Sequence, residues 1–246
     1  DYHRFRRLGL DAPAVDRAAQ GARDFPGFVR RLYDELAAQR RKPLAGDKTP
    51  GYVRHLPLLA ALFPEARIVH LIRDGRDVAL SALEWATPSK GPGRLPLWSE
   101  DPIAVCALWW RERVEAGRRE GRSLGPDRYL EVRYEDLVAE PERELARVTC
   151  FLGLDAAPEM LAFNRGKVRL EPALSAKKAW RSPMPGLRDW RRQMDPASAE
   201  LFEVLAGETL EASGYPTRGA LPCSRAVRAR ARRARRELGE TVVSYA

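Results

Sequence analysis

The spacing of apolar and polar positions changes period along the chain, and each change predicts a different element. The apolar run I-V-H-L-I at residues 68–72 is typical of a strand buried on both faces of a sheet. The turn-forming pair Asp74-Gly75 ends this run, and apolar residues recur at helical spacing after Asp77. We therefore expect a strand, a tight turn and a helix, with Asp74 as the N-cap of the helix and Asp77 as its capping-box acid.

Further elements follow from the same criteria. Residues 128–133 alternate as a second strand should, and the apolar run at 43–45 is taken as a third. Helices are expected within 1–42, at 52–63 with a break at Pro57, from Asp101-Pro102 onward, at 141–152 and at 196–210. The helix at 141–152 should end at Gly153, and the helix after Asp101-Pro102 should have an inner stripe of Ile103, Ala107, Trp110 and Val114. Strand 43–45, helix 52–63 and strand 68–72 form a right-handed βαβ unit. The fold class is thus α/β, with a mostly parallel sheet flanked by helices.

Candidate chemistry lies where strand 68–72 ends. Open α/β sheets bind ligands at the carboxyl ends of their strands, and Arg73 occupies that position. A forked guanidinium beside the free amides of a helix start favours an anion. Ser81 lies roughly 10 Å along the helix, so a phosphate shared with Arg73 would lie on the helix flank. The alternative is that Arg73 pairs with Asp77 and that Ser81 is an ordinary surface hydroxyl.

The segment I-R-D-G-R-D-V-A-L-S at residues 72–81 resembles the 3′-phosphate-binding segment of sulfotransferases that use 3′-phosphoadenosine 5′-phosphosulfate (PAPS). Similar blocks occur at R-Y-E-D-L (133–137), F-L-G-L (151–154) and G-D-K-T-P (46–50). The last block resembles the bacterial and tyrosylprotein-sulfotransferase branches. The resemblance spans most of residues 44–216 and implies a sulfotransferase fold related to the P-loop NTPases.

The resemblance also implies roles for individual residues. Arg73 and Ser81 would hold the 3′-phosphate, Tyr134 would pack against the adenine, and Lys48 would contact the transferring sulfonate. A basic segment containing Lys177, Lys178 and Arg181 would close over the cofactor's phosphates. From the residues alone, a solvated loop is equally expected there. The implied activity is sulfonate transfer from PAPS to a hydroxyl or amine of a small molecule, glycan or peptide, without a metal. The acceptor and the general base are not assigned.

One departure from the family concerns the N-terminal end. No Ser/Thr/Gly-rich phosphosulfate loop and no G-x-x-x-x-G-K-[ST] motif occurs, so we expect the first β-loop-α unit to be missing. A P-loop-type small-molecule kinase or NTPase, which shares the fold, is one alternative. The other is a non-catalytic protein that binds an anion, nucleic acid or a membrane surface through the basic residues at 217–246. The loop at 84–101, rich in Pro, Gly and Ser, is expected to be either a lid, an acceptor-specificity loop or a mobile insertion without a role.

Net charge and cysteine content narrow the remaining possibilities. Most of the net charge of +9 comes from residues 217–246, which hold eight arginines and two glutamates. We therefore divide the chain into a sulfotransferase-like domain, 1–216, and an Arg-rich tail, 217–246. The tail is expected to be disordered or a solvated helix, with contact to anionic lipid or nucleic acid as the alternative, while the body offers no nucleic-acid surface. Three widely spaced cysteines favour a cytoplasmic location, and neither a metal-ligand cluster nor a membrane-spanning run occurs.

Overall fold

The computed structural model describes residues 9–162, 188–219 and 222–244, excepting the side chains of 239–244. These residues divide into two compact units, which are described separately. The first comprises Asp1–Tyr52, Pro57–Ala66 and Ala162–Ser182, and the second comprises Val53–Leu56, Arg67–Leu161 and Pro183–Ala246. Within the described ranges, no helix is long and apolar enough to cross a membrane.

A helical hairpin forms most of the first unit. Helix α2 (Ala12–Gln20) packs on α3 (Phe25–Gln39), and an aspartate caps the start of each helix. A small apolar cluster joins them: Leu10, Ala14, Ala18, Leu32 and Leu36. A 3₁₀ turn at Pro50–Arg54 and α4 (Leu56–Leu62) follow, so the break expected near Pro57 is present.

The strand expected at 43–45 is wrong. The chain is irregular at these positions, and Leu44 is 52% exposed. Pro43 has no amide hydrogen to donate to a neighbouring strand, and an exposed leucine gains nothing from a sheet face. The βαβ unit proposed from the sequence is therefore not formed by the described residues.

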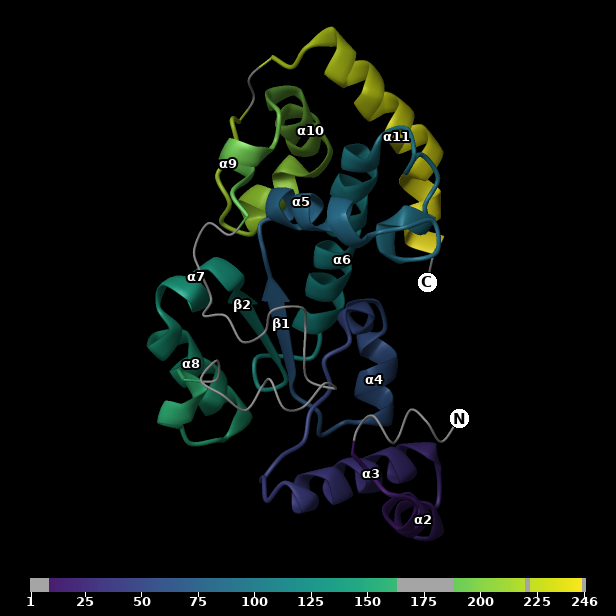
Figure 1. Cartoon of the computed structure of the whole chain (residues 1–246), viewed down its shortest axis with the longest axis vertical. Coiled ribbons are helices and arrows are strands. Elements are labelled where there is room, and N and C mark those ends of the chain that lie inside the picture. The colour runs from purple at the N-terminus through teal and green to yellow at the C-terminus, as the bar shows by residue number, and fades with distance from the viewer. Residues whose placement is uncertain (1–8, 163–187, 220–221, 245–246) are drawn as a thin grey trace. The chain divides into compact units, whose positions relative to one another are not determined.

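A parallel strand pair lies at the centre of the second unit (Figure 1). Strand β1 (Ile68–Ile72) pairs with β2 (Tyr129–Arg133), in a register that runs from Ile68 opposite Tyr129 to Ile72 opposite Arg133. Helices α5 (Gly75–Trp85) and α6 (Pro102–Arg122) connect the strands. A strand–helix–strand crossover of this kind is what an α/β fold requires, so the predicted fold class is confirmed.

Burial along β1 alternates. His70 and Ile72 are buried, whereas Val69 and Leu71 on the opposite face are 37% and 50% exposed. The expectation of a strand buried on both faces is therefore wrong for β1. The buried face packs on α6, where Gly117 allows close approach: a Cβ there would lie 2.5 Å from Cε1 of His70.

The main core lies between α6, α5 and α10 (Pro196–Ala212). The inner stripe expected on α6 is confirmed, since each member is buried: Ile103, Ala107, Trp110 and Val114. The 84–101 segment contributes Leu95 and Leu97 to this core, which contradicts the mobile-insertion alternative. Helices α7 (Tyr134–Ala139) and α8 (Pro141–Leu152) follow β2, and α8 ends at Gly153 in the left-handed conformation, with φ of 70°.

The Arg-rich segment forms helix α11 (Arg225–Ser244), which packs on α6 and α10. Its inner stripe is buried: Val227, Ala231, Ala234 and Leu238. Arg230 donates to both carboxylate oxygens of Asp101, at 2.8 and 2.9 Å. The expectation of a disordered or fully solvated tail is therefore wrong for the described part of this helix. The sequence pattern did not predict this stripe because two of its four members are alanines, whose small side chains give a weak apolar signal. The domain limits at 216/217 stay a prediction.

Buried His70 makes stability depend on pH. Its Nδ1 lies 2.6 Å from the Tyr129 hydroxyl, and burial lowers the His70 pKa from 6.5 to about 4. The unfolded chain therefore binds a proton at a pH where the folded chain does not, and folding stability falls as pH drops from 6.5 toward 4. We expect this residue to account for about 2 kcal/mol of stability lost between pH 7 and pH 4.5. Urea unfolding at both pH values should show a smaller loss for His70→Gln, and equal losses would contradict the assignment.

Candidate functional site

The candidate site lies at the carboxyl ends of the two strands. Ile72 and Arg133 are the last paired residues, and Arg73 and Tyr134 immediately follow them. The guanidinium carbon of Arg73 lies 4.8 Å from the centroid of the Tyr134 ring, which is a cation–π distance. The main chain at Arg73 is fixed as well, because its carbonyl accepts a hydrogen bond of 3.0 Å from Nε1 of Trp110. Two of the residues singled out from the sequence are thus in contact.

Arg73 has spare donor capacity. Of the five N–H donors of a guanidinium, it uses one on Oδ2 of Asp77, at the long distance of 3.4 Å. Its Nε is buried and has no partner among the described residues. The side chain is 26% exposed. The ion pair with Asp77 foreseen as the alternative is therefore present, but it leaves a buried cationic donor open to an anion.

Ser81 lies on α5, half-buried. Its hydroxyl makes no hydrogen bond to another residue in the described ranges. A free hydroxyl on the helix that begins beside Arg73 is compatible with the shared-phosphate hypothesis, which stays a prediction.

Asp77 does not form the expected capping box. Its side chain is turned toward Arg73 on one side and accepts a hydrogen bond of 2.9 Å from the main-chain N–H of Trp190 on the other. Burial raises the pKa of this carboxyl above its ordinary value, and the two donors partly oppose the shift. Asp74, in contrast, is the helix N-cap that the sequence predicts, and it accepts from the N–H of Arg76.

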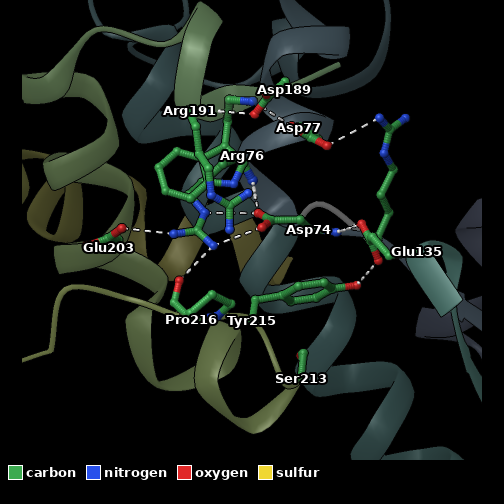
Figure 2. Close-up of polar contacts among 12 residues, drawn as sticks. Asp74, Arg76, Asp77, Glu135, Asp189, Arg191, Glu203, Ser213, Tyr215 and Pro216 are labelled. Atoms are coloured by element: carbon green, nitrogen blue, oxygen red, sulfur yellow. Dashed lines mark hydrogen bonds and ion pairs between the residues drawn. The ribbon is translucent and has the colours of Figure 1, made fainter. Parts of the chain in front are cut away.

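Arg76 is fully buried, and its guanidinium lies among the polar groups of Asp74, Glu203 and Pro216 (Figure 2). Its guanidinium donates to both oxygens of Asp74, at 3.0 and 2.8 Å, to Glu203 at 2.8 Å and to the carbonyl of Pro216 at 3.0 Å. The Trp190 ring covers it at 3.7 Å. Sequence reasoning did not single out Arg76, and the two Asp-flanked arginines of R-D-G-R-D give no local sign of which one is buried.

Glu135 lies in the first turn of α7, and its carboxylate links three segments of the chain (Figure 2). One carboxylate oxygen accepts from the N–H of Asp74 at 3.0 Å, and the other accepts from the Tyr215 hydroxyl at 2.7 Å. The Tyr215 hydroxyl also lies 3.1 Å from the carbonyl of Ile72. Burial and the Glu135 carboxylate raise the pKa of Tyr215 well above its usual value, so it stays a neutral donor. These contacts fix the end of β1, and with it Arg73.

The remaining predicted residues belong to other parts of the chain. Lys48 belongs to the first unit, whereas Arg73, Ser81 and Tyr134 belong to the second. The basic residues Lys177, Lys178 and Arg181 lie outside the described residues.

A family model described as "Sulfotransferase family" matches residues 3–158 of the chain. The chain belongs to the sulfotransferase family. This membership confirms the resemblance drawn from the sequence blocks and does not favour the kinase or NTPase alternative.

Similar proteins include a putative protein-tyrosine sulfotransferase of Caenorhabditis elegans, 28% identical over 139 residues, which are 56% of this chain and 51% of that protein. The omega-hydroxy-beta-dihydromenaquinone-9 sulfotransferase Stf3 of Mycobacterium tuberculosis is 28% identical over 134 residues, covering 52% of this chain and 32% of that one. The sulfotransferase domain of the Synechococcus PCC 7002 olefin synthase superposes with a TM-score of 0.56 at 25% identity, over 87% of this chain and 80% of that domain. This sulfotransferase chain thus spans about half, or less, of the two curated relatives named here.

Proposed function

We propose that this protein transfers a sulfonate group from PAPS to a hydroxyl or amine acceptor. The observation that carries the proposal is Arg73: a buried guanidinium nitrogen without a partner among the described residues, at the ends of two parallel strands, in a member of the sulfotransferase family. Orphaned buried donors are costly, so a bound anion would remove an existing penalty. When bound, PAPS supplies the sulfonate that the acceptor receives.

Three residues of the second unit are assigned to the nucleotide. Arg73 binds the 3′-phosphate through its free donors, and the Ser81 hydroxyl donates to the same group. Tyr134 offers a ring that already carries the Arg73 guanidinium on one face, and we assign the adenine contact to this side chain. Arg76, Glu135 and Tyr215 hold the strand ends rigid, which keeps Arg73 in a fixed orientation for the phosphate.

Basic residues are assigned to the sulfonate and to the phosphates of the donor. Lys48 is the residue of the first unit that would contact the transferring group, where a compact cation stabilises charge on the bridging oxygen. Lys177, Lys178 and Arg181 are proposed to contact the nucleotide phosphates. Positioning and charge stabilisation would then supply most of the rate enhancement, as in phosphoryl transfer.

The acceptor is proposed as a class only. Relatives are named for acceptors of three kinds: protein tyrosine, a dihydromenaquinone and, in the mouse carbohydrate sulfotransferase 5, a carbohydrate. All three kinds present a nucleophilic oxygen. We therefore propose a small-molecule, glycan or peptide acceptor, used in the cytoplasm, and do not assign the α11 arginines a role in its binding.

Donor choice is testable by thermal shift. A ligand present at 100 times its dissociation constant stabilises the folded state by about 2.7 kcal/mol, which for a chain of this size is a rise of roughly 5–10 °C. We expect this rise with 3′-phosphoadenosine 5′-phosphate (PAP) and no comparable rise with ATP and magnesium. Stabilisation by ATP and magnesium alone would refute the sulfotransferase proposal in favour of a kinase.

A further inference from the structure

Asp77 is the one acid that contacts Arg73 within the described residues, and it has a second partner far along the chain. Oδ2 faces Nη2 of Arg73 at 3.4 Å, while Oδ1 accepts from the N–H of Trp190 at 2.9 Å, across a sequence separation of 113 residues. Only 9% of the residue is exposed. A buried carboxylate needs its donors, so both contacts contribute to holding it in place.

The chain around Trp190 is attached to α5 at three points. Arg188 pairs with Glu84 near the end of α5, the Trp190 N–H binds Asp77, and the Trp190 ring stacks on Arg76 at the start of α5. Arg191 covers the same ring at 4.7 Å. Of these three attachments, only the hydrogen bond from the Trp190 N–H involves a residue, Asp77, that also contacts Arg73.

The two bonds of Asp77 differ in quality. The bond to Trp190 has the length of a normal N–H···O hydrogen bond, whereas 3.4 Å exceeds the usual range. A phosphate that binds Arg73 competes with Asp77 for one guanidinium, and two anions on one cation repel each other. The weaker bond is the one that the competition removes.

We propose that Asp77 is a positioning residue. In the free protein it binds and orients Arg73, and it loses this contact when the 3′-phosphate binds Arg73, while its bond to the Trp190 N–H keeps that part of the chain attached to α5. This proposal rests on the proposed function, because it takes the 3′-phosphate as the ligand of Arg73. The family assignment by itself gives no role to this carboxylate. Its consequence is that Asp77 lowers the affinity for the nucleotide while it maintains the site's shape.

Two substitutions separate the two bonds. Asp77→Asn keeps an oxygen that accepts from the Trp190 N–H, but its amide N–H₂ cannot accept from Arg73. Asp77→Ala removes both bonds. Asp136→Asn is the matched control, since Asp136 also pairs loosely, at 3.5 Å, with an arginine at a strand end, Arg133.

Affinity for PAP, measured by calorimetry, tests the competition. We expect Asp77→Asn to bind PAP about 3- to 10-fold more tightly than the wild type, and Asp136→Asn to bind within twofold of it. A carboxylate with a purely structural role would give weaker or unchanged binding on substitution. Unchanged or weaker binding by Asp77→Asn would therefore overturn the proposal.

Amide exchange at Trp190, followed by NMR in the ligand-free protein, tests the attachment without the nucleotide. We expect exchange at least tenfold faster in Asp77→Ala and close to the wild-type rate in Asp77→Asn. Equal rates in wild type and Asp77→Ala would overturn the proposal. If the wild type binds no PAP, the proposed function is refuted, and so is the competition between Asp77 and the 3′-phosphate. If the wild type binds PAP but the Asp77 variants behave like it, only the proposal for Asp77 is refuted.

Discussion

Replacing Arg76 by alanine should lower the free energy of unfolding by about 3–5 kcal/mol, the cost of breaking a buried ion pair by removing one partner. The side chain is fully buried and donates to Asp74, to Glu203 and to the Pro216 carbonyl. Its removal leaves the Asp74 carboxylate, 7% exposed, without its cation, and leaves the Glu203 carboxylate, 9% exposed, with Arg218 as its remaining cationic partner. It also removes the nearer of the two guanidinium groups that cover the Trp190 ring, and leaves only Arg191 there among the described residues.

The Arg76 network matters because of the distances that it spans along the sequence. Asp74 is two residues away, Glu203 is 127 away and Pro216 is 140 away, so a single guanidinium joins the start of α5 to α10 and to the segment after it. Arg76→Lys keeps the charge but has no planar fork for Asp74, so we expect it to recover less than half of the lost stability.

Urea unfolding measures these differences, and Arg143→Ala is the control. Arg143 also pairs with two acids, Glu140 and Glu144, but its side chain is 58% exposed. Solvent screens such pairs, so its removal should cost no more than about 1 kcal/mol. Similar losses in Arg76→Ala and Arg143→Ala would show that the buried network contributes no more than a surface pair, and our account of the fold would be wrong.

Much of the fold could be predicted because the relevant signals are local. Strand β1, the Asp74 cap, the α6 stripe and the Gly153 terminus each depend on residues within a few positions of one another. The site was predictable to the same extent, since Arg73 and Tyr134 lie directly after two predicted strands, one indicated by the apolar run at 68–72 and the other by the alternation at 128–133. Their contact follows from parallel pairing in register.

The failures have a common physical cause, which is that tertiary partners decide the outcome. Arg73 and Arg76 sit in equivalent local sequence, and Glu203 determines that Arg76 is the buried one. The sequence predicted a solvated helix at α11 because its buried stripe consists partly of alanine. The stripe is recognisable only from its packing against α6 and α10. Residues 43–45 have the apolar composition of a strand but no strand beside them among the described residues.

Arg73→Ala is expected to weaken PAP binding by about 2 kcal/mol or more, which is roughly 30-fold in the dissociation constant. The expected loss is that of a charge-assisted bond to a phosphate, formed by a donor that is buried and has no partner in the part of the chain that the structure describes. Stability should change little, because the only side-chain bond that Arg73 makes to a described residue is the long one to Asp77. Calorimetry with PAP and urea unfolding of the same preparations separate the two effects.

Arg133→Ala provides the matched control for this measurement. Arg133 ends the neighbouring strand, stacks on Tyr215 at 4.7 Å, pairs loosely with Asp136 and has a buried Nε without a described partner. It therefore repeats the environment of Arg73 but packs on Tyr215 instead of Tyr134. We expect its removal to change PAP affinity less than threefold.

Equal losses in both variants would mean that PAP responds to general positive charge at the strand ends. An unchanged affinity in Arg73→Ala would exclude this residue from the nucleotide site. A selective loss in Arg73→Ala, partly recovered in Arg73→Lys, is the pattern that a specific 3′-phosphate contact requires.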